Sequence, residues 1–163
     1  MKNLFIMRHG KSSWELNVSD QDRPLLQKGM VDAQMVSAEL AGKNLKIDKV
    51  FSSPANRALH TCMICLRTLN YPLIDFSVAS DLYDFSGEKV IDFIKNFDDS
   101  LESVLIFGHN HTFTYLANAM GNRHIDNVPT SGFVQLQFKE TKWASISKGS
   151  TIQTIFPKQL KAW

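Results

Sequence analysis

The sequence predicts an α/β fold in which a largely parallel sheet is layered between helices. Short apolar runs typical of buried strands recur along the chain, and segments with apolar residues at helical spacing separate them. No internal repeat, linker or low-complexity tract interrupts this alternation. With 163 residues, 44% of them hydrophobic, the chain is long enough for one sizeable core. We therefore expect a single domain over residues 1–163.

The first third of the chain predicts a strand, a loop, a helix and a second strand. Residues 2–7 form an apolar run that ends abruptly in Arg8-His9-Gly10, as expected for a buried strand that leads into a loop. The loop, residues 11–24, is polar. A helix is predicted from Leu26 to about Lys43, because its apolar residues recur at helical spacing: Leu26, Met30, Ala33, Val36 and Leu40. Residues 47–51 follow as the second strand.

The middle of the chain opens with a helix-start signal. Ser52-Ser53-Pro54 combines serines able to cap free backbone amides with a proline, which the first helical turn tolerates. Tyr71-Pro72 ends this helix, and residues 74–78 predict a short strand. Another amphipathic helix follows Ser86-Gly87, with apolar residues at Val90, Ile91, Ile94 and Phe97.

The last third begins with residues 104–107, a buried-strand run that ends in Gly108-His109-Asn110. A short helix over residues 113–120 is closed by Gly121, a residue suited to the left-handed conformation after a helix end. Residues 133–138 and 151–156 have the composition of strands, with a hairpin-like region over residues 139–150 between or beside them.

Two histidines and two arginines are expected on one rim of this sheet. In open α/β sheets, ligands bind at the carboxyl ends of the strands, where the following loops and helix starts gather. Arg8 and His9 end the first strand, Arg57 lies one turn into the helix after the second, and His109 follows the run 104–107.

This set of side chains suits a phosphoryl group. A guanidinium is permanently charged and offers a planar fork of donors that matches phosphoryl oxygens. Two guanidinium groups also disfavour the protonated form of a nearby imidazole, so His9 would stay neutral. A neutral imidazole can attack phosphorus with one nitrogen while the other keeps its proton.

Three separated motifs carry a resemblance to a known family. Met7-Arg8-His9-Gly10, Ser52-Ser53-Pro54 with Arg57-Ala58 and Thr61, and Gly108-His109-Asn110 resemble, in this order, the signature of the histidine phosphatase, or phosphoglycerate-mutase-like, superfamily. Finer detail in residues 8–14, 22–25 and 126–132 is similar to the small SixA-type phosphohistidine phosphatases. The resemblance implies a three-layer fold with a mostly parallel central sheet and helices on both faces.

The resemblance also implies a mechanism. His9 would become transiently phosphorylated, Arg8 and Arg57 would bind the phosphoryl oxygens, His109 would donate to the phosphoryl group, and water would release phosphate. Ser12 and Asn110 are further candidate phosphate-binding residues. Neither a metal nor another cofactor is expected, because these side chains already supply the charge stabilisation that phosphoryl transfer needs.

The general acid is the open position of this assignment. Superfamily members that act on phosphate esters carry a glutamate in a Leu-x-Glu segment, and Leu82-Tyr83-Asp84 matches its spacing with an aspartate. Asp84 is therefore the candidate acid, with Asp81 or Glu88 as substitutes, while a helix-capping or solvated Asp84 stays an alternative. An N–P bond depends less on a strong acid than an ester does, which favours a phosphohistidine-bearing protein as substrate.

Composition limits the remaining possibilities. The net charge of +2 arises from 18 basic and 16 acidic residues without a basic stripe, so neither a nucleic-acid nor a membrane partner is expected. The amino terminus lacks a signal-peptide core and Cys62 and Cys65 form a poor disulfide framework, which favours the cytoplasm. These cysteines are expected to pack in the core rather than bind zinc. Trp14 is expected to wall the site.

Two other functions are compatible with the sequence. The first is a small-molecule phosphomonoesterase, or less readily a mutase, in which Asp84 would work as an acid. The second is a phosphate-binding interaction module that has lost turnover, against which the intact His9, Arg8, Arg57 and His109 argue. The oligomeric state and the physiological substrate do not follow from the sequence.

Overall fold

The chain folds around a single mixed sheet, in a computed structural model that describes residues 1–161. The strand order is β3-β2-β4-β1-β5-β6. Pairing is parallel between β3, β2, β4 and β1, and antiparallel from β1 to β5 and from β5 to β6. The strands span Lys2–Arg8, Lys49–Ser52, Phe76–Val78, Ser103–Gly108, Phe133–Phe138 and Ser150–Ile155, for β1 to β6 in order.

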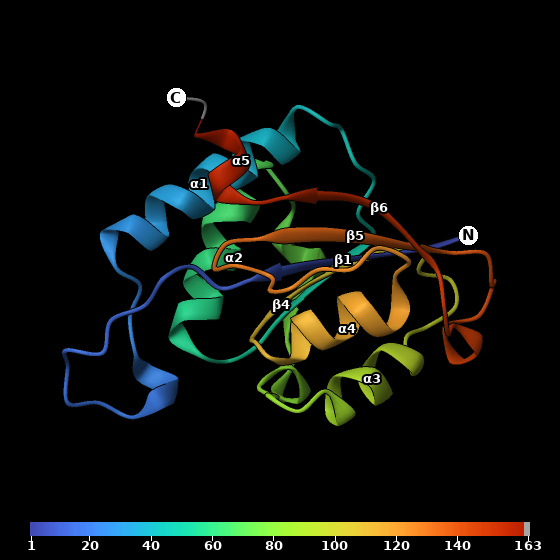
Figure 1. Cartoon of the computed structure of the whole chain (residues 1–163), viewed down its shortest axis with the longest axis horizontal. Coiled ribbons are helices and arrows are strands. Elements are labelled where there is room, and N and C mark those ends of the chain that lie inside the picture. The colour runs from blue at the N-terminus through green and yellow to red at the C-terminus, as the bar shows by residue number, and fades with distance from the viewer. Residues whose placement is uncertain (162–163) are drawn as a thin grey trace.

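Helices cover both faces of this sheet (Figure 1). Helices α1 and α2, with the short α5, lie on one face, and α3 and α4 lie on the other. The helices span Gln27–Ala41, Asn56–Thr68, Glu88–Lys95, Thr112–Met120 and Pro157–Leu160, for α1 to α5 in order. The predicted three-layer α/β fold with a mostly parallel sheet is confirmed.

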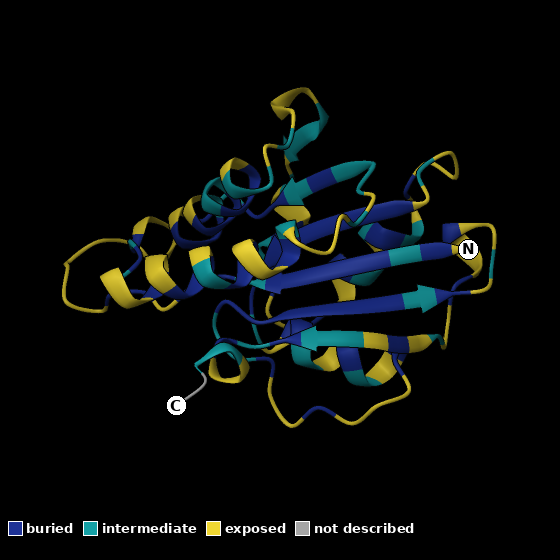
Figure 2. Cartoon of the chain, turned by 90° about the horizontal axis from the view of Figure 1, so that it is seen from above, coloured by how far each residue is buried: buried dark blue, intermediate teal, exposed yellow. Residues whose placement is uncertain are grey.

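Strand alternation divides the core into two layers. Successive side chains of a strand point to opposite faces, so Leu4 and Ile6 pack with α3 and α4 while Phe5 and Met7 pack with α1 and α2. Figure 2 shows the resulting pattern, with buried strands in the middle and exposed residues on the outer sides of the helices. In residues 1–161, no helix is long and apolar enough to cross a lipid bilayer.

Cys62 and Cys65 belong to the core layer between the sheet and α2. Both are fully buried free thiols, and burial raises the pKa of Cys65 to about 11 and that of Cys62 still further. A thiol with so high a pKa is neither a good nucleophile nor a ready metal ligand. The packing interpretation of these cysteines is therefore confirmed.

Several element boundaries differ from the sequence prediction. Residues 73–75 form a 3-10 turn, so β3 begins only at Phe76, and Ile74 is 87% exposed instead of lying in a strand. Gly121 follows α4 with an extended backbone, φ −98°, and not with the expected left-handed one. Glycine is needed there for space, because a Cβ would lie 2.6 Å from the carbonyl oxygen of Ala117.

Candidate active site

A cavity of about 310 Å³ lies where the carboxyl ends of the parallel strands meet. Arg8 is the last residue of β1, and His109 follows the last residue of β4. Arg57 lies in the first turn of α2, which follows β2. The residues that line the cavity are Arg8, His9, Lys11, Ser12, Trp14, Asp20, Arg23, Arg57, Phe85, Asn110 and Thr130.

His9 is 8% exposed and held in one tautomer. Its Nδ1 lies 2.7 Å from the carbonyl oxygen of Gly10, which can only accept, so Nδ1 carries the proton and Nε2 keeps its lone pair. Burial, opposed by this hydrogen bond and assisted by the charges of Arg57 and Arg8, lowers the pKa of His9 to about 4. The imidazole is therefore neutral at physiological pH.

The backbone around His9 is fixed from the far end of the chain. The amide of Ser131, just before β5, lies 3.1 Å from the carbonyl oxygen of Arg8 and 3.0 Å from that of His9. Ser131 is fully buried and adopts a positive φ of 60°. A Cβ on Gly10 would lie 2.8 Å from the carbonyl oxygen of Gly29, so the glycine lets this turn pack closely against α1.

His109 lies next to His9, with 5.2 Å between the ring centroids. It is 1% exposed, and its Nε2 lies 2.8 Å from the hydroxyl oxygen of Ser53. The rings of Tyr83 and Phe85 pack against it, with centroids 5.4 and 5.0 Å away. Burial, followed by the charges of His9 and Arg57, lowers the pKa of His109 to about 3. A second neutral imidazole thus stands beside the first.

Within the described residues 1–161, both arginines keep buried N–H donors that have no partner. Arg8 donates from Nη1 to the carbonyl oxygen of Val128 at 2.8 Å, and its Nε is buried and unpaired. Arg57 is 2% exposed and donates from both Nη atoms to Asp20, while its Nε is likewise unpaired. Nδ1 of His109 is a third buried nitrogen without a partner in this part of the chain. Arg8 and Arg57 line the cavity, and His109 packs against His9, which also lines it. Unpaired buried polar atoms are costly, so this grouping points to an external acceptor.

Asp20 is a central residue of the site that the sequence did not point to. Its carboxylate accepts hydrogen bonds from Arg57 at 2.9 Å, Arg23 at 3.0 Å and the Tyr83 hydroxyl at 2.6 Å. Burial acts to raise the pKa of Asp20, but these hydrogen bonds outweigh it and hold the pKa far below its usual range. Asp20 therefore positions the Arg57 guanidinium as an ionised carboxylate.

Ser12 and Asn110 line the cavity, but their polar atoms already have partners. The hydroxyl of Ser12 accepts a hydrogen bond from Nη2 of Arg23 at 2.5 Å. The side-chain amide of Asn110 donates to Asn127 at 2.8 Å, and its oxygen accepts from the backbone and hydroxyl of Thr114. Both residues are brought to the cavity, where they hold neighbouring segments in place.

Asp84 is not brought to the cavity, which corrects the prediction of a general acid there. It is 6% exposed, and its two carboxylate oxygens accept hydrogen bonds from Ser86, Gly87 and Val90 at the start of α3. Burial acts to raise the pKa of Asp84, but these hydrogen bonds lower it overall. Asp84 is thus an ionised helix cap, the alternative that the sequence left open.

Other acidic groups do not replace Asp84. The two substitutes, Asp81 and Glu88, are exposed and do not line the cavity. Among its lining residues the only carboxylate is Asp20. In residues 1–161, no group of three or more His, Cys, Asp or Glu side chains is placed to hold a metal ion.

Comparisons with known proteins identify the family of the chain. The family model of the histidine phosphatase superfamily, branch 1, matches residues 4–86. An uncharacterised protein of Mycobacterium tuberculosis is 30% identical over 155 residues, which cover 88% of this chain and 93% of that protein. A 2,3-bisphosphoglycerate-dependent phosphoglycerate mutase of Beijerinckia indica is 36% identical over 72 residues, 42% of this chain and 35% of the mutase.

Solved structures share the fold over nearly the whole chain. The protein histidine phosphatase SixA, solved with tungstate, superposes with a TM-score of 0.82 at 24% identity, covering 98% of this chain and 99% of its own. A second structure that bears the SixA name, from Agrobacterium tumefaciens, has a TM-score of 0.79 at 23% identity and covers 94% and 97% of the two chains.

Proposed function

Because the chain belongs to the histidine phosphatase superfamily, we propose that it hydrolyses the N–P bond of phosphohistidine in a protein, with His9 as the nucleophile. One observation carries the proposal: Nε of Arg8, Nε of Arg57 and Nδ1 of His109 are buried without partners among residues 1–161, and their side chains surround the neutral His9. Two guanidinium N–H groups, and a ring nitrogen that can carry a proton, match a phosphoryl group, whose oxygens accept hydrogen bonds and carry negative charge.

The first step transfers the phosphoryl group to His9. The lone pair on Nε2 forms a bond to phosphorus while the substrate's P–N bond breaks, and its electron pair moves to the leaving imidazole nitrogen. Arg8 and Arg57 neutralise the charge on the phosphoryl oxygens. We assign the Ser53 hydroxyl, 2.8 Å from Nε2 of His109, as the donor of that hydrogen bond, which places the ring proton of His109 on Nδ1 for donation to the phosphoryl group.

The second step returns His9 to its starting state. A water oxygen forms a bond to phosphorus, the P–Nε2 bond breaks, and the electron pair returns to Nε2. The proton lost by the water leaves with the phosphate or enters solvent. Throughout the cycle the carbonyl oxygen of Gly10 keeps the proton on Nδ1 of His9, so the same nitrogen remains the nucleophile.

The state of Asp20 and Asp84 favours hydrolysis of an N–P bond over hydrolysis of a phosphate ester. An alkoxide leaving group needs a proton donor, but Asp20 is held ionised by two arginines and Asp84 caps α3. An imidazole is a better leaving group, because it can carry a proton on its second ring nitrogen near neutral pH. The exposed apolar side chains at the cavity mouth, Trp14 and Phe85, support a protein as the carrier of the phosphohistidine.

We further propose that residues 1–163 form one histidine phosphatase domain and that it works in the cytoplasm. The two buried thiols, Cys62 and Cys65, are not joined in a disulfide, as suits a reducing compartment.

The test compares three substrates: a histidine-phosphorylated carrier protein, phosphoramidate and p-nitrophenyl phosphate. We expect kcat/KM to be highest for the phosphoprotein, and we expect a labelled, acid-labile phospho-enzyme that maps to His9. Ester hydrolysis faster than N–P hydrolysis would instead favour a small-molecule phosphomonoesterase. Tight phosphate binding without turnover of any of the three would identify an interaction module.

A further inference from the structure

The in-line geometry of phosphoryl transfer separates the floor of the cavity from its mouth. The leaving group departs on the side of phosphorus opposite the nucleophile. Because His9 and Arg57 are buried at the floor, the leaving group must lie toward the exposed lining residues. The large apolar side chains among these are Trp14, which is 78% exposed, and Phe85, which is 47% exposed.

Trp14 is held in place although it is exposed. The guanidinium carbon of Arg23 lies 3.2 Å from the centroid of the Trp14 ring, which is a cation–π stack. This stack covers one face of the ring. The exposure of the side chain shows that the rest of its surface is open to solvent.

Arg23 is itself immobilised. It is 7% exposed, and its Nε, Nη1 and Nη2 donate to the carbonyl oxygen of Ser13, to Asp20 and to Ser12. A side chain with every nitrogen engaged has few rotamers left, so the ring stacked on it is preorganised. Ordering such a ring on binding then costs little conformational entropy.

Phe85 provides a second aromatic surface from another segment of the chain. Its ring packs against Tyr83 and His109, with centroid distances of 5.2 and 5.0 Å. The Tyr83 hydroxyl in turn bonds to Asp20, in the loop that carries Trp14. The two exposed rings are thus anchored in two loops that a hydrogen bond connects across the site.

We propose that Trp14 and Phe85 form an aromatic leaving-group subsite that binds the imidazole ring of the phosphohistidine. The inference rests on the proposed function. It adds a contact for the leaving group, which is the part of the substrate beyond the phosphoryl group. Imidazole is a flat aromatic ring, and aromatic pairs gain energy beyond the area they bury. The subsite would distinguish phosphohistidine from phosphoramidate, whose leaving group is ammonia.

The experiment measures the ratio of kcat/KM for free phosphohistidine to kcat/KM for phosphoramidate. We expect Trp14→Ala to lower this ratio roughly three- to tenfold, within the range that an aromatic pair contributes. Trp14→Phe should retain most of the ratio, and Trp14→Leu should lose it, because leucine is apolar without being aromatic. Ile74→Ala, which alters an 87% exposed side chain outside the cavity lining, is the matched control.

Several outcomes would overturn the subsite. An unchanged ratio in Trp14→Ala, or an equal loss in Trp14→Phe and Trp14→Ala, would contradict an aromatic contact. A loss seen with the phosphoprotein but not with free phosphohistidine would make Trp14 a protein-docking residue instead. Failure of the proposed function is a separate result, because the wild-type chain would then hydrolyse neither N–P substrate.

Discussion

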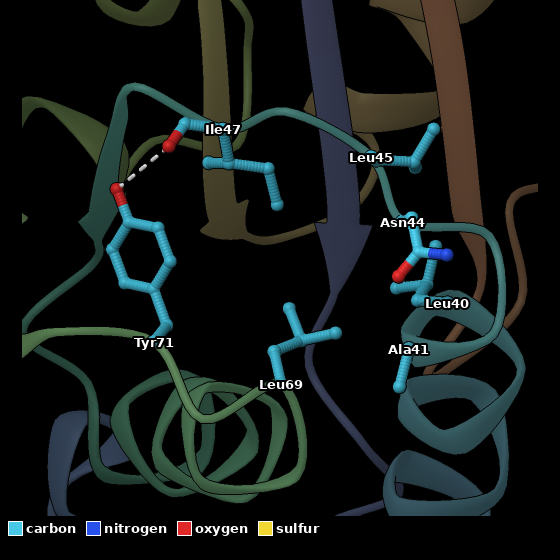
Figure 3. Close-up of a pocket in the computed structure, with 7 residues that line it drawn as sticks. All are labelled: Leu40, Ala41, Asn44, Leu45, Ile47, Leu69 and Tyr71. Carbon is cyan, nitrogen blue, oxygen red and sulfur yellow. Dashed lines mark hydrogen bonds between the residues drawn. The ribbon is translucent and has the colours of Figure 1, made fainter.

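Two of the hollows in residues 1–161 are similar in size but differ in their linings. The cavity at the carboxyl ends of the strands measures about 310 Å³, and a crevice beside the amino end of β2 measures about 260 Å³. Figure 3 shows the crevice, which is lined by Leu40, Ala41, Asn44, Leu45, Ile47, Leu69 and Tyr71. The Tyr71 hydroxyl in this crevice already has a hydrogen-bond partner, because it donates to the carbonyl oxygen of Ile47 at 3.1 Å.

The difference in lining distinguishes a functional site from a gap in side-chain packing. The crevice holds no charged side chain, and burial raises the pKa of Tyr71 to about 12, which keeps the phenol neutral. At the cavity, by contrast, lie permanent charges and a pair of adjacent imidazoles with lowered pKa values, together with buried nitrogens that have no partner in residues 1–161. Cavity volume therefore does not distinguish the functional site from the crevice, whereas buried polar atoms without hydrogen-bond partners do.

Removing the nucleophile should have the largest effect. His9→Ala is expected to lower kcat for phosphohistidine by roughly 10⁴-fold or more and to abolish the labelled phospho-enzyme, because the proposed covalent intermediate forms on His9. Leu69→Ala, in the crevice, is the counterpart and should leave kcat/KM unchanged. Phospho-enzyme formation by the His9→Ala protein would identify another nucleophile.

The substitution of Arg57 is expected to have the second-largest effect on activity. Arg57→Ala is expected to cost about 3 kcal/mol of transition-state stabilisation, or roughly 10²–10³ in kcat/KM, as when one preorganised donor is removed. Arg57→Lys keeps the charge but loses the planar fork, so it should recover only part of the rate. Full recovery by lysine would mean that charge alone matters at this position.

The acidic limb of the pH profile tests the electrostatics of the cavity. Protonation of His9 removes its lone pair, so kcat/KM should fall as pH drops through about 4, the lowered pKa of His9. At pH 5 the enzyme should be about thirtyfold more active than an unperturbed histidine would allow. NMR titration of the His9 ring, assigned with His9→Ala, provides the direct check; a midpoint near 6.5 would contradict it.

Asp84 should affect stability more than chemistry. Asp84→Ala leaves the first amides of α3 without their cap, which is expected to lower the free energy of unfolding by about 1–2 kcal/mol. Phosphoramidate hydrolysis should persist below the melting temperature of the variant. Selective loss of ester hydrolysis in the still-folded protein would restore Asp84 as the acid.

The smallest effect is expected in the crevice. Tyr71→Phe removes one hydrogen bond to Ile47 and should lower the free energy of unfolding by about 1 kcal/mol. Denaturant unfolding measures this change, and kcat/KM for phosphohistidine should match that of the wild type. A change in kcat/KM would show that the two hollows are coupled, against the comparison drawn above.

The site residues that were predicted best from the sequence are those at the ends of strands. Arg8 and His109 follow apolar runs whose strand character is clear, and parallel strands place their carboxyl ends together. The position of Asp20 could not be predicted in this way, because it lies in a polar loop and meets Arg57 through a contact 37 residues along the chain. For Asp84, spacing alone could not distinguish a cap from an acid, since only the hydrogen bonds to α3 decide between them.

The backbone amide of Ser131 donates hydrogen bonds to the carbonyl oxygens of Arg8 and His9, and this has a consequence for synthesis on the ribosome. Residues 4–86 contain His9 and Arg57, yet the turn that holds His9 is fastened by an amide more than 120 residues further on. The nascent chain cannot complete this turn until the start of β5 has emerged and paired with β1. Catalytic competence should therefore arise late, as one of the last events of maturation.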